Sequence, residues 1–521
     1  MKRIINIISS LAITVLVSAQ TEFDALKYLQ SDITGTARYS AMAGAFGALG
    51  ADPSAIKDNP AGLGIYRSSE LSTTFNVLSQ STQSEWMRNK ASDGLFKGGF
   101  NQLSLVLSNT PNSSFSRSIG LNRSNWAFSY NRLKDFNRQL KINGGKGVSG
   151  SALEYISYFT GDISGNDLYR SGNYDPYNNV SVPWISVATA NAGLINEFVY
   201  DDNGETAYWA PILESNETVS PSYYQRESGH LSEYALSWSG NIHNRLFLGA
   251  SMNIYDMEYT VNSEYKEEFS VVGSMNLDNY LNSKATAIGF RFGAIYIPFD
   301  FLRFGASLQA PMLYSVGDFS NLYLDYDNGG DDYGTEKTPD AYNNFKLQTP
   351  MILNLSAALI QGKQGVIGIE YINTQNNTTR FMDESNNTYS YRYENDTIQA
   401  TFNSQHTFKI GGEFKVNPKV ALRAGYAYST PATLSRLSKE MNPNTNRTDI
   451  HYLVPGVTSY LTGGLGYRSE AWAFDLAVVH KSQNDEFYAF NPSKVSTNLQ
   501  FPAATINTSN LSVLATLSVR F

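Results

Sequence analysis

The chain has 521 residues, a formal net charge of −8 and no cysteine. The lack of cysteine excludes disulfides, thiolate metal sites and cysteine nucleophiles, and the acidic balance argues against nucleic-acid binding. Charged residues make up 17% and aromatic residues 13% of the chain, while a mean hydropathy of −0.30 is too polar for a helical membrane protein. This composition suits a β-barrel, in which only alternate residues meet lipid.

Residues 1–19 predict a secretory signal peptide. Lys2 and Arg3 precede an apolar run from Ile4 to Val17, and small residues lead to a cleavage site before Gln20. An N-terminal membrane anchor is the alternative. No later stretch has the roughly 18 unbroken apolar residues that a transmembrane helix needs, so we expect an exported chain that spans a membrane with strands.

Residues 20–69 do not have a strand pattern. A short helical pattern is followed by a stretch rich in alanine and glycine, with glycines at Gly35, Gly44, Gly47, Gly50, Gly62 and Gly64. Such a stretch predicts a compact backbone rather than a strand. Ahead of a barrel, it is expected to fold inside the lumen as a plug, which we call the hatch.

Residues 70–521 show repeated alternation of apolar and polar side chains, which is typical of strands with one face to lipid. The alternation predicts about fourteen antiparallel strands, near 70–78, 100–109, 123–131, 233–241, 245–258, 284–297, 301–310, 350–360, 364–373, 405–415, 419–429, 459–468, 471–482 and 509–521. The expected fold is therefore an all-β transmembrane barrel of about fourteen strands with an N-terminal hatch.

The predicted connections alternate between tight turns and long loops after the fourth strand. Short periplasmic turns and long extracellular loops are typical of outer-membrane barrels. The long loops are predicted at 259–283, 311–349, 374–404, 430–458 and 483–508. The longest gap, 132–232, is predicted to be an extracellular loop with room for one or two further strands.

The predicted loop 311–349 contains two features of interest. The first feature is a cluster of apolar residues, which is a candidate surface for ligand capture. Packing among the loops is the alternative. The cluster comprises Met312, Leu313, Tyr314, Val316, Phe319, Leu322 and Leu324. The second is an acidic segment in which Asp325, Asp327 and Glu336 match positions 1, 3 and 12 of a calcium loop. Because a glycine replaces one expected ligand and no flanking helices are evident, a solvated acidic loop is favoured and no metal is expected.

Four basic residues are predicted to face the lumen: Arg291, Arg303, Lys409 and Arg423. The plain interpretation is that they pair with carboxylates across the barrel, and the functional one is that they bind a substrate carboxylate or fix the hatch. The five histidines lack metal-ligand spacing, and no nucleophile elbow or phosphate loop is present. The chain is therefore not expected to be an enzyme or to hold a cofactor.

The last eleven residues predict the closing strand of the barrel. Leu511, Val513, Leu517 and Val519 alternate with polar residues, and the chain ends on the aromatic Phe521. A terminal aromatic suits the membrane interface of a barrel. Phe521 is therefore a candidate signal for the barrel assembly machinery.

Residues 37–63 resemble the hatch of the FadL/TodX family of outer-membrane transporters for fatty acids and other hydrophobic compounds. The resemblance rests on the Gly-Ala run, on Asp52 and above all on Asn59-Pro60-Ala61-Gly62, although Asn-Pro also starts ordinary turns. The flanking sequence looks most like the Bacteroidetes branch of that family. The resemblance implies a monomeric barrel in the outer membrane of a Gram-negative bacterium, surrounded by lipid, with residues 59–62 at the gate.

The expected function is passive uptake of long-chain fatty acids or other hydrophobic small molecules through a hatch-gated channel, with exit commonly sideways through the barrel wall. Two alternatives stay open. Some FadL-like proteins of the PorV type hold exported proteins for type IX secretion, which long tyrosine-rich loops would suit. A general polar porin is the other alternative, which the plug-like segment argues against.

Overall fold

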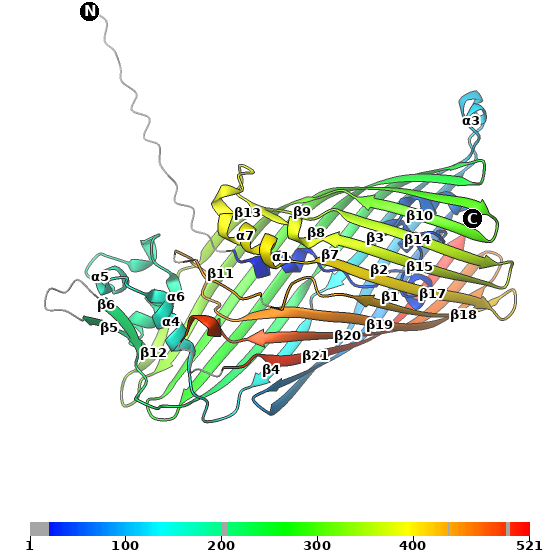
Figure 1. Cartoon of the computed structure of the whole chain (residues 1–521). Helices are drawn as coiled ribbons and strands as arrows, with labels where there is room; N and C mark the ends of the chain where they lie inside the picture. The colour runs from blue at the N-terminus through cyan, green and yellow to red at the C-terminus, as the bar shows by residue number, and fades with distance from the viewer. Residues whose placement is uncertain (1–19, 200–206, 436, 443, 496–500) are drawn as a thin grey trace, which may run out of the picture.

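The computed structural model describes residues 20–199, 207–435, 437–442, 444–495 and 501–521, so the predicted signal peptide lies outside the described residues. Fourteen strands form one closed antiparallel barrel (Figure 1). In order around the barrel they are β1 (Glu70–Trp86), β2 (Asn89–Asn109), β3 (Leu121–Asp135), β7 (Val219–Ile242), β8 (Leu246–Phe269), β9 (Ser274–Phe299), β10 (Leu302–Gln309), β14 (Ile352–Gln361), β15 (Gly365–Gln375), β17 (Ser404–Lys415), β18 (Val420–Ser429), β19 (Tyr452–Arg468), β20 (Trp472–Tyr488) and β21 (Ala504–Arg520).

The barrel closes where β21 pairs with β1, from Arg520 opposite Glu70 to Thr505 opposite Glu85. Each of the fourteen strands overlaps one that the alternation predicts, although several extend well beyond the predicted bounds, and the prediction of a fourteen-stranded barrel with an internal hatch is confirmed. The side chains of β21 face as predicted. Leu511 and Val513 are exposed on the outer wall, while Leu514 and Thr516 are buried inside.

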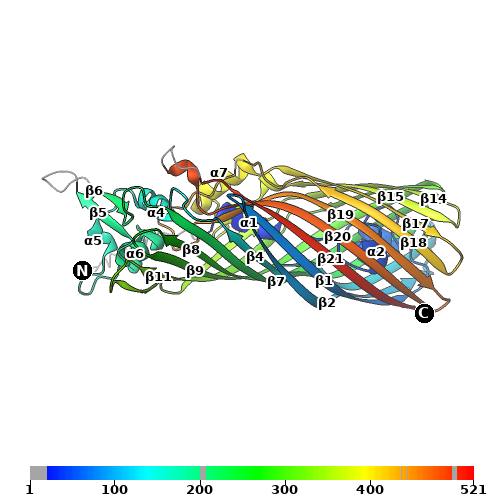
Figure 2. The ribbon, with the colours of Figure 1, turned by 90° about the horizontal axis from the view of Figure 1, so that it is seen from below.

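The two ends of the barrel differ. At the turn end, where the C-terminus lies, short turns such as 243–245 and 469–471 join the strands. At the loop end, strands extend further and carry short elements: β4 (Arg138–Asn143), β11 (Leu313–Asp327), β12 (Tyr333–Lys337), β13 (Ala341–Gln348), β16 (Arg380–Met382), η4 (Asn376–Thr378), η5 (Tyr389–Tyr391), α7 (Arg392–Thr401) and η6 (Pro492–Lys494). Figure 2 shows the two ends at opposite extremes of the long molecule.

The prediction of long irregular loops at the loop end is wrong for two of the five. The range 259–283 is mostly strand, because β8 and β9 continue to a tight connection at 270–273, and 311–349 forms β11, β12 and β13. The physical reason is visible in β8. Leu248, Met252 and Ile254 face outward in the apolar belt, whereas beyond it Met257 and Tyr259 face inward. The apolar side chains therefore change from the outer to the inner face of the strand. A pattern with one apolar face ends at this point, although the strand itself continues.

The predicted loop 132–232 contains a folded module at the loop end. It comprises α4 (Ala152–Thr160), α5 (Gly165–Leu168), η3 (Pro176–Asn178), α6 (Trp184–Asn191) and the ribbon of β5 (Ile195–Val199) with β6 (Ala207–Pro211). A short α3 (Ser114–Ser118) lies at the other end of the barrel (Figure 1). None of the described helices is long and apolar enough to cross a membrane.

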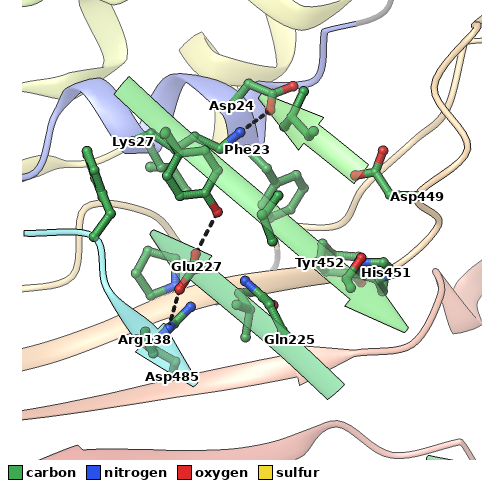
Figure 3. Close-up of a pocket in the computed structure, with 18 of the residues that line it drawn as sticks. Phe23, Asp24, Lys27, Arg138, Gln225, Glu227, Asp449, His451, Tyr452 and Asp485 are labelled. Carbon is green, nitrogen blue, oxygen red and sulfur yellow. Dashed lines mark hydrogen bonds and ion pairs between the residues drawn. The ribbon is translucent and has the colours of Figure 1, made fainter. Parts of the chain in front are cut away.

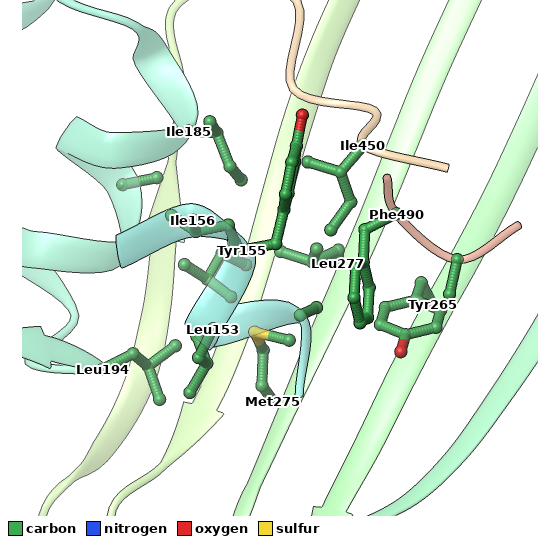
Figure 4. Packing of buried hydrophobic residues seen from close by; sticks show 14 of the residues in the cluster. Leu153, Tyr155, Ile156, Ile185, Leu194, Tyr265, Met275, Leu277, Ile450 and Phe490 are labelled. Carbon is green, nitrogen blue, oxygen red and sulfur yellow. The ribbon is translucent and has the colours of Figure 1, made fainter. Parts of the chain in front are cut away.

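The module packs onto the extended strands through a buried apolar cluster. Leu153 and Ile156 of α4 lie against Met275 and Leu277 of β9, and Tyr155 stacks on Phe490 with ring centroids 5.9 Å apart (Figure 4). Burial of this kind contributes roughly 25 cal/mol per Å² of apolar surface. The module is therefore a packed cap on the loop end rather than an irregular loop.

Candidate functional site

The hatch lies inside the barrel (Figure 1). Its elements are α1 (Glu22–Tyr28), α2 (Ala37–Ala41), η1 (Pro53–Lys57) and η2 (Pro60–Ile65). The side chain of Thr36 caps α2, that of Asp52 caps η1 and that of Asn59 caps η2. The caps explain why short helical turns form in a glycine-rich stretch, because each satisfies an otherwise unpaired backbone N–H.

Asn59 joins the hatch to itself and to the wall. Its Oδ1 accepts a hydrogen bond from the Ala61 N–H at 3.1 Å, and its Nδ2 donates to the Gly47 carbonyl at 2.8 Å and to the Ala294 carbonyl of β9 at 3.2 Å. The carbonyl of Ala61 accepts from Ser239 of β7 at 3.2 Å. The motif 59–62 is therefore a structural contact between hatch and wall, and its role in gating stays a prediction.

A belt of wall glycines lets the hatch backbone approach the wall. At seven inward positions on seven strands, an added Cβ would overlap hatch atoms: Gly249, Gly293, Gly305, Gly368, Gly411, Gly425 and Gly464. Glycine inside a strand is favoured where another backbone comes close. Within the hatch, Gly62 packs on Gly50, whose φ of +59° lies in the left-handed region. We name the seven wall residues the glycine belt.

The predicted lumen charges do face the lumen, and two of the four contact the hatch directly. Arg303 donates to the Leu49 carbonyl at 2.8 Å. Lys409 pairs with Glu370 at 2.9 Å and with Asp58 of the hatch at 3.7 Å. The Glu370 carboxylate also accepts from the Gly47 N–H at 2.8 Å. These charges fix the hatch to the wall.

The other two predicted charges pair with side chains of nearby strands on the inner face of the wall. Arg423 lies between Glu413 at 2.7 Å and Asp475 at 2.6 Å. Glu413 in turn binds Arg38 of the hatch at 2.8 Å. Arg291 contacts Glu233 at 3.2 Å and Gln309 at 2.6 Å. Paired charges and hatch contacts therefore belong to one network, and binding of a substrate carboxylate by these residues stays a prediction.

Two cavities lie on either side of α1. The first, of about 200 Å³, lies toward the loop end and is lined by charged and aromatic residues that include Lys27, Arg138, Glu227 and Tyr259 (Figure 3). The second, of about 250 Å³, lies between α1 and the rest of the hatch. Its lining is richer in apolar side chains, among them Leu26, Leu29, Ile33, Leu133, Leu231, Met312, Tyr314, Ile352 and Ile372.

The structure places the predicted apolar cluster 312–324 on a strand, not on a water-facing loop. Tyr314, Val316, Leu322 and Leu324 face inward on β11 and are buried, while Leu313 faces outward. The reason is again the change of apolar face above the membrane belt. Of the cluster, Met312 and Tyr314 line the second cavity, so a role in ligand contact stays a proposal for these two.

The acidic segment forms the β11–β12 hairpin. Asp325 pairs with Thr335, and the neighbouring Leu324 pairs with Glu336, so Asp325 and Glu336 lie on opposite faces of the ribbon. Glu336 binds Arg170 and Tyr177 of the module. Among the described residues, no group of three or more acidic or histidine side chains could hold a metal ion.

The wall is not paired along its whole height between β2 and β3. β2 pairs with β1 from Asn89 onward but with β3 only from Gln102 to Asn109. Beyond that point β3 and then β4 pair with β7 alone, and β4 bends inward until its Lys141 carbonyl accepts from Ser84 of β1. Residues 89–101 of β2 thus have one unpaired edge, opposite residues 134–138, which line the first cavity. We call this break in the strand pairing the wall gap.

The hatch contacts both strands at the end of the wall gap that lies nearest the turn end. The Asp32 N–H donates to the Leu133 carbonyl of β3 at 2.8 Å, and Thr34 donates to the Arg132 carbonyl at 2.9 Å and to Asn101 of β2 at 2.7 Å. The hatch therefore bonds to both strands where their own pairing stops. Lys97, on the same face of β2 as Asn101, and Asp135, which lines the first cavity, form an ion pair of 3.3 Å across the gap.

The comparisons with known proteins agree with this architecture. Residues 227–451 match the family model for outer membrane protein transport proteins of the OMPP1/FadL/TodX type. The chain is FadL/TodX-like. It is an outer-membrane barrel of a Gram-negative bacterium and, at the coarse level that the match supports, a transporter of hydrophobic compounds. In outer-membrane barrels the turn end faces the periplasm.

One solved structure supports the fold of this FadL/TodX-like chain. A Pseudomonas aeruginosa FadL homologue aligns with a TM-score of 0.52 and 13% identity, over 94% of this chain and 99% of that one. The Ralstonia pickettii toluene transporter TbuX aligns with a TM-score of 0.48 and 13% identity over the same shares. Among curated proteins, none matches the sequence.

Sequence reasoning missed the wall gap, the glycine belt and the residues that join hatch to gap. A signal for the belt was present, because Gly368, Gly411 and Gly464 interrupt strand patterns, and glycine there indicates a close backbone approach. Asp32 and Lys134 carried no signal, since they fall in a polar stretch and in a range predicted to be loop.

Proposed function

We propose that the protein carries long-chain fatty acids or similar hydrophobic small molecules passively across the outer membrane, through a hatch-gated lumen. The observation that supports this most directly is the second cavity. Apolar side chains of hatch and wall line it together with charged ones such as Lys57 and Lys409, and the hatch elements lie between it and the turn end. A concave apolar site with a few polar groups is the usual form of a small-molecule site.

Two lining residues of this cavity are proposed ligand contacts. Met312 adapts its shape readily to different apolar partners, and Tyr314 offers a buried ring whose edge packs on Tyr28 of α1 with centroids 5.3 Å apart. A ligand in this cavity therefore touches both the wall and the hatch. Contact with both is what a gate that responds to its ligand requires.

The hatch is the proposed gate, with the motif 59–62 as its anchor. Replacing Asn59 by alanine removes the cap of η2 and leaves the buried Gly47 and Ala294 carbonyls without this donor. Unpaired buried groups cost about 1–3 kcal/mol each, so the hatch would dock less firmly. We expect Asn59→Ala to alter uptake of a radiolabelled fatty acid by cells, with surface expression held equal.

The wall gap is the proposed exit, because it lies beside the first cavity and outward-facing Phe96 and Phe100 border it with apolar surface. Closing it tests the route. The chain has no native cysteine, so Lys97→Cys/Asp135→Cys can be joined specifically by a short bis-maleimide. The proposal predicts that uptake falls after crosslinking and is unaffected in the unlinked double variant.

The matched control crosslinks Glu85→Cys/Lys90→Cys. These positions face each other across the β1–β2 hairpin, where the strands are already paired, so the link closes nothing. Equal uptake by both crosslinked variants would exclude the wall gap as the exit.

The alternative scaffold function for exported proteins rests on one observation. The module exposes the stacked aromatic pair Phe198 and Tyr208, with ring centroids 5.3 Å apart, on the β5–β6 ribbon. Exposed aromatic side chains are common at protein interfaces. Deleting the ribbon would abolish capture of exported proteins if the scaffold function is right, and would leave fatty-acid uptake intact if the transport function is right.

A further inference from the structure

The residues just before β19 cross the mouth of the barrel at the loop end. Residues 444–451, all of which the structure describes, form neither helix nor strand, and we call them the strap. The Thr448 hydroxyl donates to the side-chain oxygen of Asn279 on β9 at 2.5 Å, and β19 begins four residues later at Tyr452. On the shorter way around the barrel, β10, β14, β15, β17 and β18 lie between β9 and β19. Because four residues span at most about 14 Å, the strap crosses the lumen instead of following its rim.

The strap separates the first cavity from the module. Four of its residues line that cavity on the inner side: Arg447, Thr448, Asp449 and His451 (Figure 3). On the outer side, Ile450 belongs to the buried apolar cluster of the module, beside Tyr155 (Figure 4). The Trp184 N–H of α6 donates to the Thr445 carbonyl at 3.1 Å. A ligand that moves from the loop end into the first cavity therefore has to pass the strap.

Side-chain contacts, rather than strand pairing, hold the strap in place. Arg447 donates to both carboxylate oxygens of Asp449, at 2.7 and 3.0 Å, and Lys439 pairs with the same carboxylate at 2.9 Å. Arg447 also lies 3.6 Å from Asp24 of α1, so the strap touches the hatch. A segment held by a few side-chain contacts opens at a lower free energy than a strand held by a ladder of backbone hydrogen bonds.

We propose that the strap is a second gate, at the loop end, which moves away from β9 to admit a ligand to the first cavity and pivots where it joins β19. The inference rests on the proposed function for the movement of ligand, and it places a gate on the opposite side of the cavities from the hatch. The contact between Arg447 and Asp24 links the two gates, because movement of the strap removes a partner from α1.

A disulfide between strap and wall tests this gate. The chain has no native cysteine, and the short side chains of Asn279 and Thr448 are in contact. Asn279→Cys/Thr448→Cys can therefore be joined by mild oxidation with small adjustments of the backbone. We expect oxidation to abolish uptake of radiolabelled hexadecanoate by cells that carry the crosslinked variant, and reduction to restore it, because a gate that cannot open blocks entry. Recovery on reduction also shows that the double variant folds.

The matched control is Ser72→Cys/Ser104→Cys. The two hydroxyls lie 2.8 Å apart on β1 and β2, where the strands are already paired, so this disulfide should leave uptake at the wild-type level. Undiminished uptake by the crosslinked strap variant, or an equal loss in the control, would overturn the inference while leaving the proposed function standing. Wild-type uptake no greater than that of cells without the protein would instead contradict the proposed function.

Discussion

At the scale of single residues, the contact between hatch and wall depends on glycines of the wall, which have no side chain. Gly411 and Gly412 are neighbours on β17. An added Cβ at Gly411 would overlap Met42 of the hatch, whereas at Gly412 it meets only the Val366 carbonyl at 3.6 Å. The hatch backbone can therefore lie directly against the wall at the position that has no side chain.

This pair gives a prediction for substitution by alanine. Gly411→Ala should displace the hatch and increase ion conductance of the purified barrel in planar bilayers, because the lumen is otherwise closed by backbone in close contact. Gly412→Ala is the matched control and should conduct as little as the wild type. Equal conductance of the two variants would show that the belt does not hold the hatch.

Glu22 provides a second prediction, on pH. It lies in α1 and is 3% exposed, and burial raises the pKa of its carboxyl to about 8, partly offset by Lys439. The pKa of Glu22 in the folded protein lies above its ordinary value of 4.5, so the docked helix is most stable below pH 4.5. It loses stability as the pH rises toward 8, by about 1.4 kcal/mol per pH unit at most.

Hydrogen exchange of the α1 amides measures this effect. Protection corrected for intrinsic rates should fall between pH 5 and pH 8 in the wild type, because the stabilisation is lost between the ordinary pKa of 4.5 and the raised pKa of about 8. In Glu22→Gln the fall should be absent, and protection at the higher pH should exceed that of the wild type. A parallel fall in both proteins would contradict the assigned cause.

At the scale of elements, sequence periodicity located every strand of the barrel but not where the strands end. β21 shows why the location succeeded, because Val513, Leu517 and Val519 face lipid in strict alternation. β8 shows why the ends failed, since its apolar face changes sides near Tyr255. The inward bend from β3 to β4 was beyond reach, because it depends on packing of Phe136 against Tyr259, 5.3 Å away between ring centroids.

The module at the loop end depends on one buried carboxylate. Glu267 of β8 accepts hydrogen bonds from the Ser151 hydroxyl, from the Ala152 N–H at 2.9 Å and from the Tyr265 hydroxyl at 2.5 Å. These contacts satisfy the N-terminus of α4. The strand thereby positions the first helix of the module.

Glu267→Ala should therefore loosen α4, at a cost of about 2–3 kcal/mol for the unpaired donors. Amide exchange in α4 should accelerate while exchange in the membrane part of β8 stays slow. Glu268→Ala is the control, because Glu268 is exposed and pairs only with Lys266 on the surface, and such pairs are worth less than about 1 kcal/mol. An equal effect of both variants would contradict the anchoring role.

At the scale of the whole molecule, the barrel, the hatch inside it and the outward faces of the strands followed from the sequence. Only part of the candidate site could be predicted from the sequence. Asn59 and the lumen charges could be predicted because motif and alternation mark them; Asn59, Arg303 and Lys409 contact both hatch and wall, whereas Arg291 and Arg423 pair within the wall. At the wall gap, Asp32 of the hatch binds Lys481 of β20, and no local sequence pattern predicts a contact between residues so far apart in the chain.

The barrel is wide, but the hatch inside it should keep the ion current through it low. Fourteen strands enclose a lumen that the hatch fills at the turn end, where ion pairs such as Arg38–Glu413 join it to the wall. A hatch held in this way is expected to restrict the flow of ions. The general polar porin is the less suitable alternative for this reason.

The most direct test of the central claim is mass spectrometry of small molecules extracted from the detergent-purified protein, together with uptake by cells that carry Asn59→Ala/Pro60→Ala. The account predicts a bound long apolar ligand in the wild type and altered uptake in the variant. An empty barrel that instead brings down exported proteins, with uptake unaffected by the substitutions, would contradict it.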